Sequence, residues 1–323
     1  MKHLSLLLIM LVSLSVFVGC SEDNPIVPVT SLSPPTDVVM VTGEFSITLS
    51  WDASTFESAA DFEGYNVYVD TTSIASVSDS TGATFLEARK VNTTPVVTRS
   101  FTVTQDGMGM DLVRGQKYYL HVRSARADGK LSIASNEVDT APRPEGSNNT
   151  GDTALLMYDF SASTSTRSAY GWDRFAGTGA PFSTNEANAA EIDFFMVEEA
   201  NSVDDGSEFV SPAQASFTSG WAIRNETLFK DLGAGDDAWN TSIAPDVADM
   251  TTKVKVIEDH TYALYTHDMQ WIKVRVIPGG LELNVEVNQS GGGTVNLNRV
   301  TFDYAYQLIN DYGRFKPGLG GAN

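Results

Sequence analysis

Cysteine is almost absent from this chain: Cys20 is the single thiol among 323 residues. Disulfides within the chain and zinc sites built from several thiolates are therefore excluded. The common catalytic patterns are absent too, since the sequence contains no GxSxG, HExxH, P-loop or strand-following GxGxxG motif. These absences favour a non-catalytic protein that needs no cofactor.

Basic residues are scarce as well. The chain has 21 Lys and Arg residues against 41 Asp and Glu residues, which gives a formal net charge of −20. A surface of this sign repels nucleic acid and anionic membranes, so we expect no nucleic-acid partner. The acidic residues are spread along the chain and are expected to form a solubilising surface.

Long apolar runs are confined to the N-terminus. Residues 5–18 are almost wholly apolar after the basic Lys2, and this run is shorter than the ~20 residues of a membrane-spanning helix. The order of charged, apolar and small residues is that of a secretory signal peptide, with cleavage expected after Gly19. The cysteine next to that cut could also be incidental to an ordinary signal peptide.

The stretch "VFVGC" resembles the lipobox of bacterial lipoproteins. The resemblance implies that Cys20 is lipidated and that the protein is exported and anchored in a membrane. Ser21 stands where the family's inner-membrane retention signal has aspartate, which implies the outer membrane, on a face that the sequence does not specify.

Proline, glycine, serine and asparagine gather in two further places, around residues 21–32 and 140–153, and mark breaks between domains. The expected division is a signal peptide at 1–19, a tether at 20–32, a first domain at 33–142, a linker at 143–153, a larger second domain at 154–315 and a disordered tail at 316–323.

What is present is a pattern of strands, which predicts an all-β, antiparallel fold. In "FSITLSW", Ile47, Leu49 and Trp51 alternate with polar residues, as in a half-buried strand. "GYNVYVD" and "YYLHVRS" alternate in the same way, and His121 is expected on the outward face of its strand. Residues 71–98 look long for a sandwich loop and are expected to form an extra edge strand or a loop.

Residues 33–142 resemble a fibronectin type III domain, an Ig-like β-sandwich. The resemblance rests on "SPPTDV", on Trp51, on "LVRGQKYYLHVRSA" and on "IASNEV". It implies that Tyr118 is the tyrosine-corner residue, with Leu112 as its apolar partner. Since a fold does not dictate a function, the domain is expected to serve as a spacer or an interaction module.

The second domain shows strands at "AAEIDFFMV" and "KVKVI" and a hairpin over 260–278. "PGG" is expected to begin a new strand, "SGGG" a turn, and "ETLFKDL" a short helix within the otherwise loop-rich segment 198–250. Alternation places Phe302, Tyr304 and Tyr306 on one face, as in a core strand.

"HTYALYTHDMQWIKVRV", followed by "VTFDYAYQ", is similar to a segment of the HmuY-like lipoproteins of Bacteroidota, with Lys273 at that family's lysine position. The resemblance implies capture of haem or another small ligand as an alternative function. The candidate ligand-binding residues are His260, His267, Met269 and Trp271.

Haem binding by both histidines is disfavoured by their spacing. His260 and His267 lie near opposite ends of one expected strand, about 20 Å apart at ~3.3 Å per residue, whereas axial ligands lie on the two sides of one iron. One histidine with Met269 remains open as an axial pair, and so does a solvent-facing position for both histidines.

Calcium and glycans complete the alternatives. Acidic, glycine-bearing loops suit calcium, with Asp236 and Asp237 as first candidates and Asp204 and Asp205 as second, although neither loop has EF-hand spacing. Exposed aromatic residues can stack on sugars, and hydrolysis would need two carboxyl groups ~5–10 Å apart in a pocket. The sequence favours a membrane-anchored, non-catalytic binding or cell-surface interaction protein whose protein, glycan or small-molecule ligand it leaves open.

Overall fold

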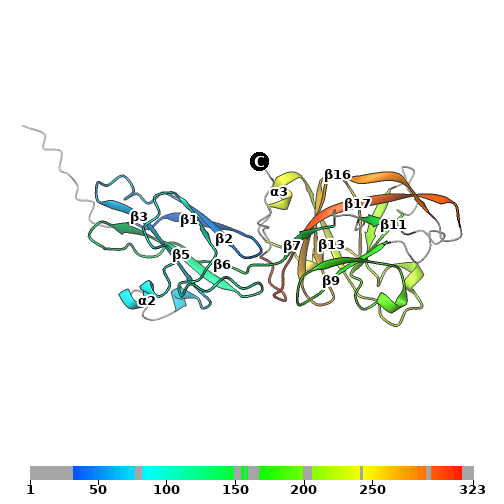
Figure 1. Ribbon diagram of the computed structural model, residues 1–323, viewed down its shortest axis with the longest axis horizontal. Helices are drawn as coiled ribbons and strands as arrows, with labels where there is room; N and C mark the ends of the chain where they lie inside the picture. The colour runs from blue at the N-terminus through cyan, green and yellow to red at the C-terminus, as the bar shows by residue number, and fades with distance from the viewer. Residues whose placement is uncertain are drawn as a thin grey trace, which may run out of the picture. The chain divides into compact units, whose positions relative to one another are not determined.

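A computed structural model of the protein describes residues 32–76, 82–148, 154–156, 158, 167–198, 206–240, 243–288 and 292–314. The described residues form four antiparallel sheets, so the all-β prediction is confirmed (Figure 1). No helix within these ranges is both long and apolar enough to cross a membrane.

The first half of the described chain is a sandwich of two three-stranded sheets. One sheet has the order β1-β2-β4 and the other β3-β5-β6. The strands are β1 (Thr36–Thr42), β2 (Ile47–Asp52), β3 (Phe62–Asp70), β4 (Ser100–Val103), β5 (Tyr118–Arg126) and β6 (Val138–Thr140). Their inward-facing apolar side chains form one core cluster around Trp51 and Tyr65, as the alternation in the sequence predicts.

The tyrosine corner lies where the sequence places it. The backbone N–H of Val113 donates a hydrogen bond to the Tyr118 hydroxyl at 3.0 Å. Leu112 is 2% exposed and packs in the same core cluster. The contact fixes the loop that leads into β5.

The outer face of the second sheet differs from the prediction. Residues 71–98 contribute a 3-10 helix, η1 (Ile74–Ser76), and the helix α2 (Ala83–Glu87). Ile74 and Leu86 pack against Tyr68 on β3. His121 lies on this outer face, as its alternation predicts, but the face is covered, so His121 is 2% exposed and its ring lies 5.1 Å from that of Tyr68.

The second half is a larger sandwich of a five-stranded and a six-stranded sheet. The five-stranded sheet has the order β10-β9-β11-β12-β14, and the other has β13-β15-β16-β17-β7, with β8 also paired to β17. The strands are β7 (Glu145–Ser147), β8 (Leu155–Leu156), β9 (Ala169–Trp172), β10 (Gly179–Phe182), β11 (Phe194–Glu198), β12 (Ser207–Val210), β13 (Leu228–Ala234), β14 (Lys253–Lys255), β15 (His260–Tyr265), β16 (Trp271–Asn288) and β17 (Thr294–Tyr306). Short helices lie between strands: η3 (Glu186–Asn188), η4 (Ser216–Thr218), α3 (Gly235–Trp239) and η5 (Val247–Asp249).

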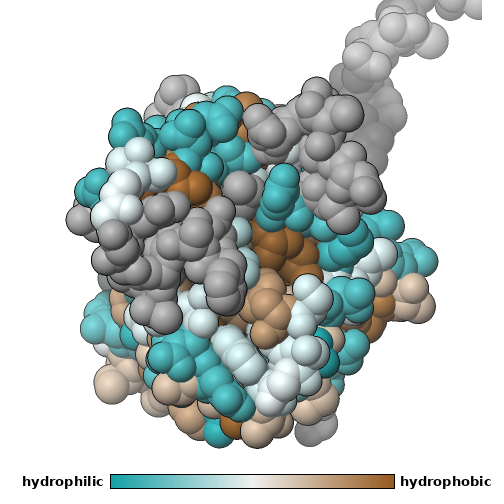
Figure 2. All heavy atoms as spheres, turned by 90° about the vertical axis from the view of Figure 1, so that its right-hand side faces the viewer, coloured by the Kyte–Doolittle hydropathy of each residue, from teal (hydrophilic) through white to brown (hydrophobic). Residues whose placement is uncertain are grey.

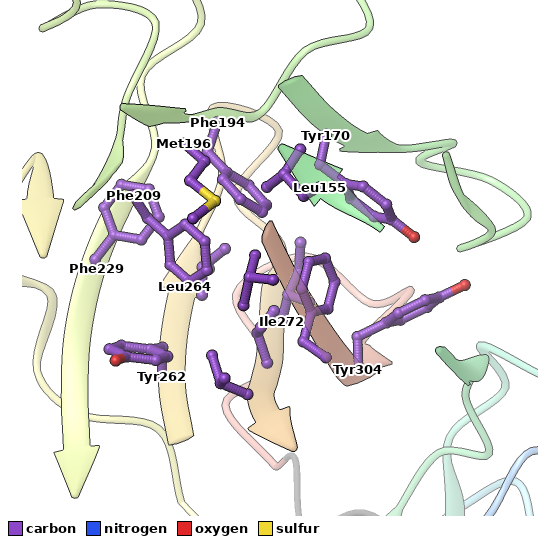
Figure 3. Packing of buried hydrophobic residues seen from close by; sticks show 14 of the residues in the cluster. Leu155, Tyr170, Phe194, Met196, Phe209, Phe229, Tyr262, Leu264, Ile272 and Tyr304 are labelled. Atoms are coloured by element: carbon purple, nitrogen blue, oxygen red, sulfur yellow. The ribbon is translucent and has the colours of Figure 1, made fainter. Parts of the chain in front are cut away.

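The core of this half is rich in aromatic residues from both sheets (Figure 3). Phe194 on β11 packs edge-on against Phe209 on β12, with ring centroids 4.9 Å apart. Tyr170 on β9 meets Phe302 on β17 across the sandwich at 5.0 Å. Phe302, Tyr304 and Tyr306 are all buried, which confirms the predicted core face of the last strand.

The predicted hairpin over 260–278 is confirmed, since β15 and β16 pair from Tyr265↔Trp271 to Thr261↔Arg275. Two other expectations are wrong. "ETLFKDL" is mostly strand β13, because Phe229 is needed in the core and the segment pairs with β15. "PGG" does not start a strand: β16 runs through it with a shifted register, and Gly279 takes φ +73°.

Part of the segment expected to be a linker is structured. Glu145–Ser147 form β7, which pairs with β17 from Ala305↔Glu145 to Asp303↔Ser147. Residues 149–153 lie outside the described ranges, as do the signal peptide, most of the tether and the tail.

Candidate functional site

A cleft of about 480 Å³ opens on the second sandwich. It lies where the end of β9, the segment before β11 and the turn between β15 and β16 come together. Its lining residues are Trp172, Asp173, Arg174, Phe175, Ala190, Glu191, Asp193, Ile223, Asn225, His267 and Asp268. Aromatic, acidic and basic side chains therefore share one concave surface.

The close approach of β9 to the segment before β11 builds one wall. A Cβ at Gly171 would overlap the carbonyl oxygen of Glu191, so only glycine fits there. The N–H of Asp193 donates to the Tyr170 carbonyl, and the N–H of Trp172 donates to Asp193 Oδ2, both at 2.9 Å. These contacts fix the Asp193 carboxyl at the base of the wall.

The residues after β9 form the rim. Asp173 Oδ1 accepts hydrogen bonds from the N–H groups of Phe175 and Ala176, both at 2.8 Å. These two bonds lower the pKa of Asp173. The turn presents Arg174 and Phe175 to solvent, and Phe175 is 77% exposed.

The turn between β15 and β16 supplies the opposite side. The N–H of Thr266 donates to the Gln270 carbonyl at 3.0 Å, and Met269 takes φ +60°, which closes the turn. His267 and Asp268 thus face the cleft. Arg174 Nη1 lies 3.3 Å from Asp268 Oδ1, which links this turn to the rim.

Asp193 has the most perturbed environment in the cleft. Its side chain is almost fully buried, and burial raises its pKa to about 7. The hydrogen bond from Trp172 opposes this shift, whereas the charges of Asp268 and Glu191 add to it. His267 Nδ1 lies 3.8 Å from Asp193 Oδ1, beyond hydrogen-bond distance. A carboxyl that ionises near neutral pH in a cleft is a typical mark of a functional site.

A second cavity, of about 520 Å³, lies over β11 and β12. Its lining includes the apolar Val197, Val210 and Phe217 and the ion pair Lys253–Glu208. Figure 2 shows the face at the right-hand end of Figure 1, where hydrophobic residues gather in a hollow with hydrophilic ones around it. The second cavity is lined by fewer charged side chains, Glu198, Glu208 and Lys253, than the first one, so we place the candidate site in the first cleft.

Of the four candidate ligand-binding residues, the structure brings His267 to this cleft. His260 lies at the other end of β15, where its Nδ1 lies 2.9 Å from Asp231 Oδ2. Trp271 is 5% exposed, with its ring 4.8 Å from that of Tyr265, and Met269 is 47% exposed on the turn. The two histidines are therefore separated by the whole of β15, as the spacing predicts.

The candidate calcium residues fall elsewhere. Asp236 lies in the first turn of α3 and accepts a hydrogen bond from Arg275 Nη1 at 2.8 Å. Asp237 is in the same turn. Across the described ranges, no three His, Cys, Asp or Glu residues are grouped to hold a metal ion. Asp204, Asp205 and Cys20 lie outside the described residues.

Sequence reasoning missed Asp173, Arg174 and Asp193 as site residues. A weak signal existed: Asp193 interrupts an apolar strand in "EIDFFMV", and Asp173-Arg174 directly follow the aromatic strand "AYGW". An ionisable residue at the end of a buried strand is a sign of function only when the fold brings a second one close to it.

Neither a protein-family description nor a curated protein sequence matches the chain. Solved structures that share part of its fold include the third fibronectin type III domain of the human KIAA0343 protein, at 19% identity, covering 38% of this chain and 90% of that domain with a TM-score of 0.25. Module A71 of titin from human cardiac muscle matches at 17% identity over 34% of this chain and 92% of the module, with a TM-score of 0.22.

An α-L-rhamnosidase from Dictyoglumus thermophilum matches at 9% identity and a TM-score of 0.29, covering 87% of this chain. The chain spans 25% of that enzyme's length. Likenesses this distant do not carry a function from one protein to another. The chain is an all-β protein whose structural neighbours include fibronectin type III domains.

Proposed function

We propose that this protein is a non-catalytic, membrane-anchored binding protein that holds a small polar ligand in the cleft around Asp193 and His267. The observation that supports this most is the buried carboxyl of Asp193, which lines the cleft and accepts one hydrogen bond, from Trp172. A buried polar group normally finds partners for its lone pairs, and a ligand donor would supply the missing one.

The two halves of the chain then have separate roles. Lipid on Cys20 anchors the protein at the outer membrane, and the first sandwich serves as a spacer or interaction module ahead of the binding half. The cleft suits a small ligand because polar and charged groups converge there beside an exposed aromatic ring.

The test is a ligand screen with the purified full-length protein in detergent, against a panel of small polar molecules and glycans, followed by nuclear magnetic resonance or calorimetry. We expect at least one ligand that shifts the signals of cleft residues and loses affinity in Asp193→Asn. The matched control Asp52→Asn, an exposed carboxylate on β2, should bind normally. If every ligand found binds with the same affinity to wild type and to all cleft variants, the proposal is refuted.

Glycoside hydrolysis is a second candidate that one observation favours. Burial raises the pKa of Asp193 to about 7, which is the range that suits a general acid at neutral pH. Glu191, Asp173 or Asp268 would be the second carboxylate. Turnover of any glycan that is lost in Asp193→Asn would establish hydrolysis, and tight binding without turnover would favour the binding protein.

Haem capture can be tested in the same preparation. Titration with haem should give a Soret band that His267→Ala weakens and His260→Ala leaves intact, since His267 lines the cleft. If the titration gives no spectral change, haem is no longer a candidate ligand.

A further inference from the structure

We infer that the ligand of the cleft is an organic cation: an ammonium group on an apolar frame, bound at the Asp193 carboxylate. This inference rests on the proposed function, because it names the chemical class of ligand for the same cleft.

The first reason is the charge of the lining. Four carboxyl groups face the cleft, and the basic side chains beside them are the guanidinium of Arg174 and the imidazole of His267. That guanidinium already lies 3.3 Å from Asp268, so one carboxylate is compensated. Within the described part of the chain, the exposed carboxylate of Glu191 contacts no cationic group. An anionic ligand would be repelled here and a cation attracted.

The second reason is the incomplete hydrogen bonding of Asp193. Its Oδ2 accepts from the Trp172 N–H at 2.9 Å. Its Oδ1 is 3.8 Å from His267 Nδ1, which is too far for a hydrogen bond, so His267 is a charged partner only when protonated and only at this longer distance. A buried carboxylate is costly without a charged partner, and an ammonium group offers both a positive charge and N–H donors.

The third reason is the apolar rim. Phe175 and Ile223 line the cleft and are 77% and 47% exposed. The guanidinium of Arg174 lies 4.7 Å over the ring of Phe175, so this ring already stacks with a cation. The carbon frame of an amine could cover these side chains while its nitrogen reaches the carboxylates.

A metal cation fits the cleft less well than an organic one. Calcium takes six to eight oxygen ligands, and no group of three or more His, Cys, Asp or Glu residues among the described ones is placed to bind a metal. Asp173 Oδ1 is also occupied by two backbone N–H groups.

The experiment compares amines with alcohols of the same frame: phenethylamine with phenethyl alcohol, and cadaverine with pentanediol. Each is titrated into the full-length protein and followed by the amide signals of cleft residues. We expect each amine to bind at least about tenfold more tightly than its alcohol. The preference should fall in Asp193→Asn and persist in the matched control Asp52→Asn.

A second variant keeps the test valid if Asp193→Asn does not fold. Glu191→Gln removes one exposed charge from the lining without breaking a side-chain hydrogen bond, and it should also weaken amine binding. Amines that bind no better than alcohols would overturn the inference. Neutral ligands that bind the cleft would then still support the proposed function, whereas a cleft that binds neither class would count against both.

The pH dependence gives a further readout. A cation binds the ionised carboxylate, so amine affinity should rise up to about tenfold per pH unit below the Asp193 pKa of about 7. The ionisable groups that face Asp193 from the packed segments are Asp173, Arg174, Glu191, His267, Asp268 and Tyr306. Because His267 is the basic side chain nearest to Asp193, the rise should be measured in His267→Gln as well, where it should persist. A pH-independent affinity in both proteins would contradict the inference.

Discussion

Acidification should weaken the first sandwich through His121, a buried histidine on β5 whose ring lies 5.1 Å from that of Tyr68 on β3. Burial lowers the pKa of His121 to about 3, and the charge of Arg123 lowers it as well. Arg123 Nε donates to His121 Nε2 at 3.2 Å, which requires a neutral imidazole with its proton on Nδ1. The folded protein therefore holds this side chain uncharged.

The magnitude follows from the two pKa values. In the unfolded chain a histidine has a pKa of about 6.5, so below that pH the unfolded state binds a proton that the folded state excludes. Stability is therefore lost as the pH falls from about 6.5 towards 3. Between pH 7 and pH 5 the loss is about 2 kcal/mol.

The assay compares wild type with His121→Gln, which keeps an acceptor for Arg123 but does not titrate. Urea denaturation at pH 7, 6 and 5, followed by far-ultraviolet circular dichroism, gives the free energy of unfolding of each protein. The wild-type value minus the variant value should fall by about 2 kcal/mol over this range. A difference that stays constant would mean that His121 titrates normally in the folded state, and the reasoning would be refuted.

Three further predictions concern the cleft and the sandwich loop. Asp193 should have the opposite pH dependence, because its raised pKa stabilises the fold below about pH 4 and this stability is lost as the pH rises through about 7. In the same urea assay, the free energy of unfolding of wild type should fall by about 3–4 kcal/mol relative to Asp193→Asn between pH 4 and pH 8. Gly171→Ala should lower the free energy of unfolding by about 1–3 kcal/mol or more, because the added methyl group overlaps the Glu191 carbonyl oxygen. An unchanged melting temperature would show that β9 and the segment before β11 move apart to make room for it. Tyr118→Phe should cost about 1 kcal/mol by leaving the Val113 N–H without its hydroxyl partner; an equal free energy of unfolding in both proteins would contradict this.

The sequence predicts the inward faces of the strands well and their outward faces poorly. Ile47, Leu49 and Trp51 alternate with polar residues because one face of β2 meets the core and the other meets water. His121 breaks this rule because η1 and α2, from a segment far back in the chain, cover the outer face of its sheet. The local sequence of β5 cannot predict that η1 and α2 cover its outer face.

The cleft was not predictable from local sequence either. Asp173, Asp193 and Asp268 come from three separate segments that converge only because β11 pairs with β9 at Phe194↔Tyr170 and the β15–β16 turn is short. In a chain with 41 acidic residues, a single aspartate carries little information. The pattern of 260–271 did predict the hairpin, whose turn carries His267 into the cleft lining.

The far half of β16 has a consequence for self-association. β15 pairs with β16 only as far as Arg275, and within the described residues no strand lies beside Leu281–Asn288 on that side. An open strand edge is a template on which a second molecule can add its own strand. Here the charges of Glu282 and Glu286 and the irregular register around Asn284, at φ +56°, oppose such pairing. The two charges and the irregular register therefore make this edge a poor template for strand addition by a second copy of the chain.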